Sequence, residues 1–275
     1  MLLDLTIAIP ARNEAKNLPG CLAAIGKELA LNIVVIDSGS DDRTVEIARD
    51  FGAEVIAFTW NGQFPKKRNW YLRNFTPQTK WVLFLDADEY LTAEFKDELR
   101  IALHQDEIVG FWLHYTIYFM GKKLKGGYPL KKLALFKVGA GEYEQIDEEQ
   151  WSNLDMEIHE HPILEGKVGE LKSKIDHQDF RGVSHYIVKH NEYASWEASR
   201  FLKLSSSSES KQSWTWKQRL KYILMRSSII GPVYFLGSFL FLGGFKDGAR
   251  GFAFAILKMS YFTQIYCKIK EAETV

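Results

Sequence analysis

Short apolar runs alternate with amphipathic stretches over residues 3–104 of the chain. The runs at 5–10, 31–37, 53–58 and 81–88 are rich in β-branched and aromatic residues, which is typical of buried strands. A stretch with helical spacing follows each run, at 13–29, 38–52, 65–75 and 92–104. This alternation predicts an α/β fold with a mostly parallel sheet flanked by helices.

Capping residues mark the ends of two of the predicted helices. Ser40 or Asp41 is expected to cap the start of the second helix, and Gly52 is expected to end it. Thr92 is expected to cap the fourth helix, directly after the fourth strand.

The pattern changes after residue 104. Residues 110–137 predict strands around a Gly-Lys turn, residues 139–170 are acidic and irregular, and residues 182–204 predict an amphipathic helix. The serine run that follows is typical of a flexible linker. We therefore expect a first domain at 1–204, which divides into two halves at residue 104, where the pattern changes. A linker at 205–213 and a helical tail at 214–275 follow.

Charge separates the tail from the rest of the chain. The formal net charge is zero, which does not favour nucleic acid as a partner, yet residues 211–275 carry ten basic and three acidic residues. A basic helix with tryptophans precedes a long uncharged stretch that glycine and proline interrupt. This predicts a tail that lies in the plane of an anionic membrane, with a true span, burial or a homo-oligomer contact as alternatives. The two cysteines fit a reducing compartment, and we see no signal peptide.

The sequence WVLFLDADEYL carries the first candidate site. A buried apolar strand runs into Asp86 and Asp88, and buried charge is unfavourable unless it is compensated. If the chain turns after Asp86, both carboxylates could bind one Mg²⁺ or Mn²⁺ ion, since both ions prefer oxygen ligands. Solvated acids at a strand end are the plain alternative.

Other polar residues follow the ends of neighbouring strands. Pro10 ends the first strand and Asp37 the second, and ligands in parallel sheets bind at this edge. Backbone amides after Pro10 could bind a phosphate, and Asp37 could accept hydrogen bonds from a ribose. The basic residues of KKRNW could meet diphosphate oxygens. Helix caps and solvated helix faces are the alternatives.

Taken together, the motifs resemble a known family. IPARNEAKNLPGCLAAI, IVVIDSGSDDRTVEIA, KKRNW and WVLFLDADEYLT occur in this order, as in family 2 glycosyltransferases with the Rossmann-like GT-A fold. The later segments HEHPILEG, IDHQDF and HYIVKHNEYASWEA resemble bacterial enzymes of the lipopolysaccharide-core and cell-envelope glucosyltransferase type. The resemblance implies a GT-A sheet followed by amphipathic and hydrophobic C-terminal helices. It also implies that residues 1–204 form the catalytic domain, with a nucleotide-binding half at 1–104 and an acceptor half at 105–204.

The same resemblance implies roles for particular residues. Asp88 would bind the metal, with Asp86 and His177 as further candidate ligands. Relatives often have an arginine where Lys131 or Lys132 stands here, so one of these lysines is expected to replace it. The nucleotide site would be formed by Pro10, Ala11, Asn13, Glu14, Asp37, Asp41, Lys67, Arg68 and Asp86.

A catalytic base is expected in the sequence MEIHEHP. The resemblance favours Glu160, with Glu157 and the imidazole of His159 as alternatives. A carboxylate there would take the proton from the acceptor hydroxyl. A zinc-protease motif is excluded because the second histidine of that motif is missing and Pro162 opposes the helix it needs.

The resulting hypothesis is an inverting, metal-dependent hexosyltransferase that uses a nucleotide diphosphate sugar. The resemblance implies that this donor is UDP-linked. Its acceptor would be a lipid-anchored or envelope glycan at the cytoplasmic face of the inner membrane, where the protein would be peripheral. A sugar-nucleotide-forming nucleotidyltransferase is one alternative, although no glycine-rich phosphate loop follows the first strand. A phosphatase of the HAD type and an inactive nucleotide-binding scaffold are the others.

Overall fold

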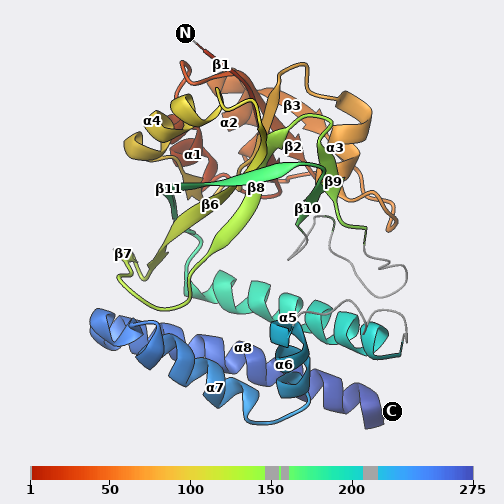
Figure 1. The fold of residues 1–275 in the computed structure, drawn as a ribbon, viewed down its shortest axis with the longest axis vertical. Helices are drawn as coiled ribbons and strands as arrows, with labels where there is room; N and C mark the ends of the chain where they lie inside the picture. Colours follow the sequence, from red (N-terminus) through yellow and green to blue (C-terminus); the bar gives the residue numbers. More distant parts are fainter. Residues whose placement is uncertain (1, 146–154, 156–160, 207–215, 275) are drawn as a thin grey trace. The chain divides into compact units, whose positions relative to one another are not determined.

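The structure is a computed structural model that describes residues 2–145, 155, 161–206 and 216–274 (Figure 1). The described residues form two compact units. The first contains Met1–Tyr118 and Leu130–Phe180, and the second contains Phe119–Pro129 and Arg181–Val275. The second unit thus begins before the serine run at which we placed the tail boundary, and it includes the helix that precedes that run. The ranges predicted as functional domains stay a prediction.

One mixed sheet forms the centre of the first unit. Its strand order is β3-β2-β1-β4-β8-β6-β11-β5, and β7 pairs with β6. The strands of its parallel half are β1 (Leu3–Ala11), β2 (Ala30–Asp37), β3 (Glu54–Ala57) and β4 (Trp81–Phe84). The others are β5 (Glu89–Tyr90), β6 (Ile108–Phe119), β7 (Lys122–Lys123), β8 (Lys131–Lys137) and β11 (Lys167–His177). A separate antiparallel pair consists of β9 (Gly141–Tyr143) and β10 (Pro162–Leu164).

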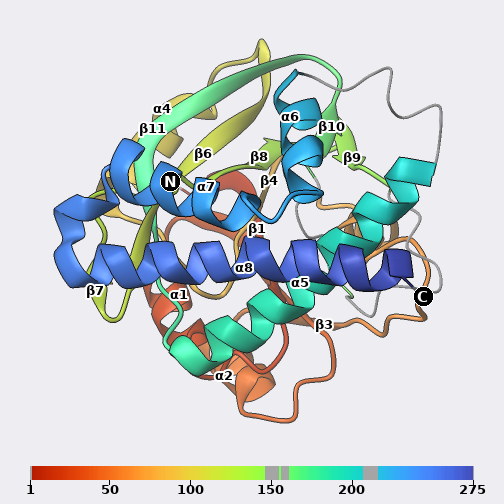
Figure 2. The same ribbon diagram turned by 90° about the horizontal axis from the view of Figure 1, so that it is seen from below.

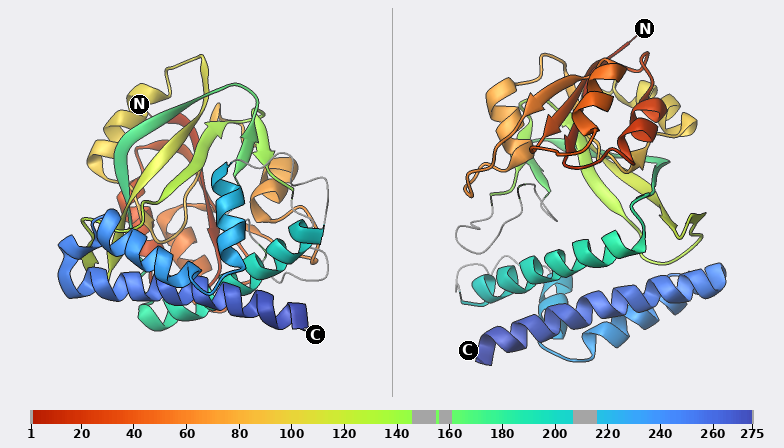
Figure 3. Two further views of the ribbon diagram at one scale, coloured as in Figure 1. Left: turned by 60° about the horizontal axis from the view of Figure 1, so that its bottom comes forward. Right: turned by 180° about the vertical axis from the view of Figure 1, so that it is seen from behind.

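The helices of this unit cover both faces of the sheet (Figure 3). They are α1 (Leu18–Ile25), α2 (Thr44–Phe51), α3 (Lys67–Phe75) and α4 (Ala93–Ala102). Side chains alternate along a strand, so Ile7 and Leu83 pack with α1, α2 and α4, whereas Ala8 and Phe84 pack with α3. The predicted fold class, with helices on both sides of a parallel half-sheet, is confirmed.

The strand order brings together the strand ends at which we predicted the site. β1 pairs in parallel with both β2 and β4, so the carboxyl ends of all three strands are neighbours. β8 then runs antiparallel between β4 and β6, so its first residues, Lys131 and Lys132, lie toward the carboxyl end of β4. Pro10, Asp37 and Asp86 therefore lie at one edge of the sheet, because the three strands that precede or contain them are neighbours.

Two of the three capping predictions are confirmed. Gly52 ends α2 in the left-handed conformation with φ 96°, and the Thr92 hydroxyl accepts a hydrogen bond from the Phe95 amide at 3.2 Å. The predicted cap of α2 is wrong, because this helix begins at Thr44. Ser40 instead contacts the loop after β1, and its hydroxyl accepts a hydrogen bond from the Asn13 amide at 2.9 Å.

The second unit is helical. It contains α5 (Val183–Ser206), α6 (Trp216–Met225), α7 (Ile230–Leu236), a π-helix (Gly237–Phe241), a 3₁₀ turn (Gly244–Asp247) and α8 (Gly248–Thr274). The α7–α8 pair forms a hairpin in which α7 lies along α8 (Figures 1 and 2). Ile230, Tyr261 and Ile265 belong to its core. None of the helices in the described part of the chain combines the length and apolar character needed to cross a bilayer.

Glycine lets the turn of this hairpin approach α8 closely. A Cβ atom at Gly251 would lie 1.9 Å from the carbonyl oxygen of Gly244, whereas a Cβ at the helical Gly237 would have no atom within 4 Å. We expect Gly251→Ala to lower the free energy of unfolding by about 1–3 kcal/mol, because backbone must shift to admit the methyl group. Thermal unfolding measures this effect.

Gly237→Ala is the matched control. Alanine replaces glycine in a helix there without a steric conflict, so its effect should be neutral or stabilising by up to about 1 kcal/mol. Equal destabilisation by both substitutions would contradict the close approach.

Candidate active site

The two aspartates that follow β4 lie in a tight turn. The amide of Glu89 donates to the carbonyl oxygen of Asp86 at 2.9 Å, which closes the turn immediately after the strand. Asp86 is partly exposed, whereas Asp88 is only 4% exposed. The carboxyl end of β4 thus presents one partly exposed and one nearly buried carboxylate.

Two cations contact Asp86 from different elements. Arg68, in the first turn of α3, places Nη2 2.9 Å from Oδ1 of Asp86. Lys132, on β8, places Nζ 2.6 Å from Oδ2 of the same carboxylate and 2.5 Å from Oε1 of Glu89. The sequence left open whether Lys131 or Lys132 enters this site. The structure places Lys132 there, while Lys131 pairs with Glu170 at 2.6 Å.

Glu89 contacts the turn from the interior of the protein. Its side chain is fully buried, and Oε2 accepts a hydrogen bond from the Asp86 amide at 3.1 Å. Burial raises the pKa of Glu89 to about 7, although Lys132 acts in the opposite direction. Burial would lower the pKa of Lys132, but Asp86 and Glu89 raise it well above its ordinary value. Glu89 therefore belongs to the internal structure of the site.

His177 lies beside Asp88. Its Nε2 is 3.6 Å from Oδ2 of Asp88, and the amide of the next residue, Gln178, donates to the Asp88 carbonyl oxygen at 2.9 Å. The register between β5 and β11, in which His177 faces Glu89, fixes this approach. Within the described ranges, no three His, Cys, Asp or Glu side chains form a ready-made metal cluster.

The loops after β1 and β2 are linked to one another. Asn13 adopts a left-handed φ of 55°, and its side-chain oxygen accepts a hydrogen bond from the Asp41 amide at 3.0 Å. Asp37 accepts hydrogen bonds from the amides of Gly39 and Ser40 at 3.0 and 3.1 Å. Asp37 is thus positioned by its own turn, and Pro10 and Ala11 pair in register with Ile36 and Asp37.

Lys67 and Arg68 point in different directions. Lys67 is only 1% exposed, and its Nζ lies 3.4 Å from the Ala11 carbonyl oxygen and 3.2 Å from Oδ2 of Asp155. Burial would raise the pKa of Asp155, but Lys67 contributes to lowering it. Arg68 therefore faces the carboxylate of Asp86, and Lys67 holds the loop after β1.

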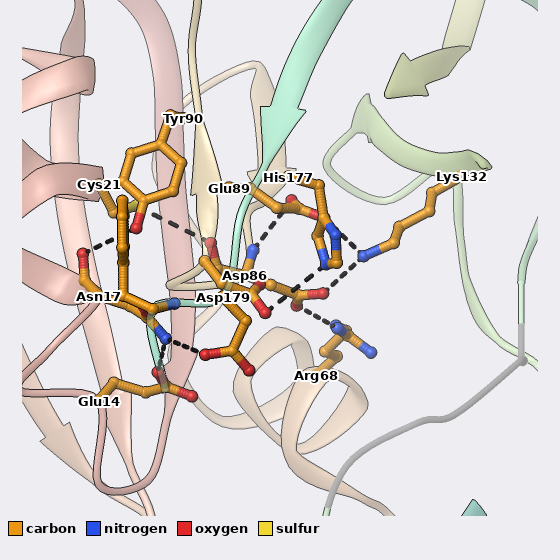
Figure 4. A network of polar contacts seen from close by, with 12 residues as sticks. Glu14, Asn17, Cys21, Arg68, Asp86, Glu89, Tyr90, Lys132, His177 and Asp179 are labelled. Atoms are coloured by element: carbon orange, nitrogen blue, oxygen red, sulfur yellow. Dashed lines mark hydrogen bonds and ion pairs between the residues drawn. The ribbon is translucent and has the colours of Figure 1, made fainter. Parts of the chain in front are cut away.

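A buried asparagine that we did not single out joins both sides of the site (Figure 4). The Nδ2 group of Asn17 lies 2.9 Å from Oε2 of Glu14 and 3.1 Å from Oδ1 of Asp179, and Oδ1 accepts from the Phe180 amide at 2.9 Å. Tyr90 donates to the Asn17 carbonyl oxygen at 3.4 Å. This side chain, which we call the Asn17 bridge, connects the loop before α1 to the segment after β11.

The three candidate bases Glu157, His159 and Glu160 lie outside the described residues. His161, the next residue, is exposed, and its ring centroid is 5.3 Å from that of Trp112 on β6. The choice among the three therefore stays a prediction.

The arrangement could bind a ligand that carries both phosphate groups and a divalent cation. Carboxylates and basic groups alternate at the edge where β1, β2 and β4 end, and the basic groups come from α3 and β8. Arginine and lysine are suited to phosphate oxygens, and a nearby carboxylate is suited to a divalent cation. A ligand that carries both a diphosphate and a cation fits this pattern.

Known proteins are similar in sequence to this chain. Residues 6–152 match the family model described as glycosyl transferase family 2. A lipopolysaccharide core biosynthesis glycosyltransferase of Rhizobium meliloti is 26% identical over 94% of this chain and 89% of its own length. A 4,4'-diaponeurosporenoate glycosyltransferase of Staphylococcus haemolyticus is 36% identical over 33% of this chain and 26% of its own.

Solved structures also match. Glucosyl-3-phosphoglycerate synthase from Mycobacterium tuberculosis, in complex with Mn²⁺ and UDP, is 20% identical, covers 42% of this chain and 44% of its own, and gives a TM-score of 0.33. The chain spans between about a quarter and two fifths of the length of the first curated relatives that it matches. The family model covers just over half of the 275 residues, and the protein belongs to glycosyl transferase family 2.

Proposed function

We propose that this family 2 glycosyltransferase is an inverting, divalent-cation-dependent hexosyltransferase with a UDP-linked donor. The observation that carries the proposal is the turn after β4, where Arg68 and Lys132 contact Asp86 and the nearly buried Asp88 follows two residues later. The turn adjoins the ends of β1 and β2, at the edge where parallel sheets bind nucleotides. A diphosphate at this edge would lie between the cations and the nearly buried carboxylate.

The residues at the turn fit a divalent cation. Asp88 would hold the ion, with Asp86 and His177 as further candidates, and Mg²⁺ sites that serve substrates often use only one or two carboxylates. A bound Mg²⁺ or Mn²⁺ ion would stabilise negative charge on the departing diphosphate.

The chain's own residues perform the remaining steps. Arg68 and Lys132 would contact diphosphate oxygens, and Asp37 would bind the ribose or base. Glu160 would remove the proton as the acceptor oxygen forms its bond to the anomeric carbon, while the bond to the diphosphate breaks and its electron pair leaves with UDP. One such displacement inverts the configuration at the anomeric carbon without a covalent enzyme intermediate.

The acceptor we propose is a lipid-linked or cell-envelope glycan. The Rhizobium meliloti relative, which spans nearly the whole chain, is named for lipopolysaccharide core biosynthesis. The basic, aromatic tail supports a peripheral position at the cytoplasmic face of the inner membrane. The protein would then meet its soluble donor and its lipid-anchored acceptor on the same side of that membrane.

A ligand screen tests the donor and the metal together. We expect one UDP-sugar to raise the melting temperature when Mn²⁺ or Mg²⁺ is present, because a ligand at about 100 times its Kd stabilises the folded state by about 2.7 kcal/mol. The shift should disappear when EDTA removes the cation. Stabilisation by another nucleotide sugar would overturn the UDP assignment, and stabilisation unaffected by EDTA would overturn the metal assignment.

A second assay tests catalysis itself. Family membership decides against the nucleotidyltransferase and phosphatase alternatives. The inactive scaffold makes a separate prediction, since it would bind the nucleotide sugar but release no UDP. Measuring UDP released from the stabilising donor, with and without acceptor lipid extract, distinguishes the enzyme from the scaffold.

A further inference from the structure

An apolar surface lines the outer side of α7 in the second unit. Four side chains at helical spacing are exposed from the residue before α7 into the π-helix, and three more are exposed at the end of the π-helix and in the turn that follows. These residues are Ile229, Val233, Leu236, Leu240, Phe241, Leu242 and Phe245. Phe241 is 85% exposed, the highest value among the large apolar residues of the described chain. Contiguous apolar surface of this kind is uncommon on a soluble monomer and marks an interaction site.

The hairpin itself does not use this surface. The opposite side of α7 packs on α8 through the buried Ile230 and Gly231. A Cβ atom at Gly231 would lie 2.2 Å from the Thr263 hydroxyl, so the two helices already meet as closely as side chains allow. The exposed side chains therefore lie outside the contact between α7 and α8.

Positive charge surrounds the end of the hairpin. Lys246 and Arg250 are exposed at the turn, and the loop Phe119–Pro129 contributes further exposed lysines, namely Lys122, Lys123 and Lys125. The amides of Lys125 and Gly126 donate to the carboxylate of Asp247 at 2.9 and 3.0 Å, which fixes this loop against the hairpin. We call residues 240–250 and this loop the hairpin tip.

The one acidic residue of the tip is engaged internally. Asp247 is the only Asp or Glu in residues 227–270, and the loop Phe119–Pro129 has none. Its carboxylate accepts the backbone hydrogen bonds of the loop. The tip therefore presents aromatic and aliphatic side chains next to a cluster of cations with little opposing charge.

We propose that the hairpin tip inserts into the interface of an anionic lipid bilayer. Phe241 and Phe245 would enter the boundary between headgroups and acyl chains, and the surrounding lysines and arginine would contact lipid phosphates. This inference rests on the proposed peripheral location and names the surface that produces it. A second copy of the chain is the less favourable occupant, because a symmetric contact would bring the same cations face to face.

Vesicle flotation tests the proposal on the full chain. The vesicles contain phosphatidylcholine with about one third phosphatidylglycerol, and matched vesicles contain phosphatidylcholine alone. We expect wild type to bind the anionic vesicles and to be released by salt. Phe241→Ser with Phe245→Ser should weaken binding by about tenfold or more, since both exposed rings would no longer be buried in lipid. Lys122→Glu with Lys123→Glu should weaken binding to the anionic vesicles selectively.

Ile101→Ser is the matched control, because Ile101 is 72% exposed on α4 of the first unit and should not affect binding. Full binding by the double phenylalanine variant would overturn the inference. So would a wild-type dimer that this variant converts to a monomer in light scattering. Stabilisation of the same variants by the nucleotide sugar is measured in parallel. A variant that keeps this stabilisation but no longer binds vesicles supports the proposed membrane contact of the hairpin tip. A wild-type protein that binds vesicles but no nucleotide sugar contradicts only the proposed glycosyltransferase chemistry.

Discussion

Replacing Asp88 with asparagine should reduce metal-stimulated sugar transfer by about three orders of magnitude. A bound divalent cation contributes several kcal/mol to the stabilisation of charge in the transition state, and each 1.36 kcal/mol is about tenfold in rate. Loss of the carboxylate that would hold the cation should therefore remove most of this contribution. The amide keeps the shape of the side chain at this nearly buried position, so the fold should persist. Transfer rates across a Mn²⁺ titration measure the effect, and a melting curve confirms folding.

Asp97→Asn on the surface of α4 is the matched control. Asp97 forms an exposed pair with Arg100 at 2.9 Å, and such pairs contribute little to stability or activity. The control should transfer sugar at the wild-type rate. If Asp88→Asn retained metal-stimulated transfer, the assignment of Asp88 as the ligand would be wrong.

Replacing Lys132 with methionine should lower the free energy of unfolding by about 3 kcal/mol. The substitution removes the cation that contacts the fully buried Glu89, and breaking a buried pair from one side typically costs about 3–5 kcal/mol. Transfer should fall as well, because Lys132 also holds Asp86. Chemical denaturation and transfer assays measure the two losses separately.

The stability loss should depend on pH in a defined direction. Burial already raises the pKa of Glu89 from 4.5 to about 7, and loss of Lys132 removes an interaction that lowers it. A raised pKa means that the folded state binds a proton which the unfolded chain has released, so this contribution favours folding at low pH and is lost as pH rises. The deficit of Lys132→Met relative to wild type should therefore be smaller near about pH 5 than near about pH 8.

A double variant separates structure from chemistry. Adding Glu89→Gln to Lys132→Met removes both charges of the buried pair, which is often close to neutral for stability. We expect the double variant to recover most of the lost stability while transfer remains low. Recovery of both properties would mean that Lys132 serves only to balance Glu89.

The parallel half of the fold was predictable because its signals are local. Each apolar run and each helical segment of residues 3–104 could be read separately, and the usual rule for strand ends then placed Pro10, Asp37 and Asp86 at one edge. Gly52 and Thr92 were predictable for the same reason, since a cap depends on neighbouring residues. The cap of α2 was not, because Ser40 contacts Asn13 across the loop.

The rest of the site depends on contacts between distant segments. The Asn17 bridge joins residues more than 160 positions apart, and no pattern around Asn17 indicates its partner Asp179. The sequence restricted the basic residue at the turn only to Lys131 or Lys132. The direction of each side chain on β8 had to be known before Lys132 could be chosen. Burial of Glu89 likewise follows from the position of β8 and β11, which sequence periodicity does not give.

The loop Phe119–Pro129 makes the second unit discontinuous in sequence. The chain leaves the first unit after Tyr118, returns at Leu130 and leaves again after Phe180. A truncation at Phe180 would keep the loop but delete Asp247 and Leu242, to which its amides donate. Such a fragment would expose unsatisfied backbone groups and apolar side chains that the second unit normally covers. A change in its solubility could then result from this structural defect as well as from loss of membrane binding. Point substitutions in the intact chain are therefore the cleaner route to separate the two units' roles.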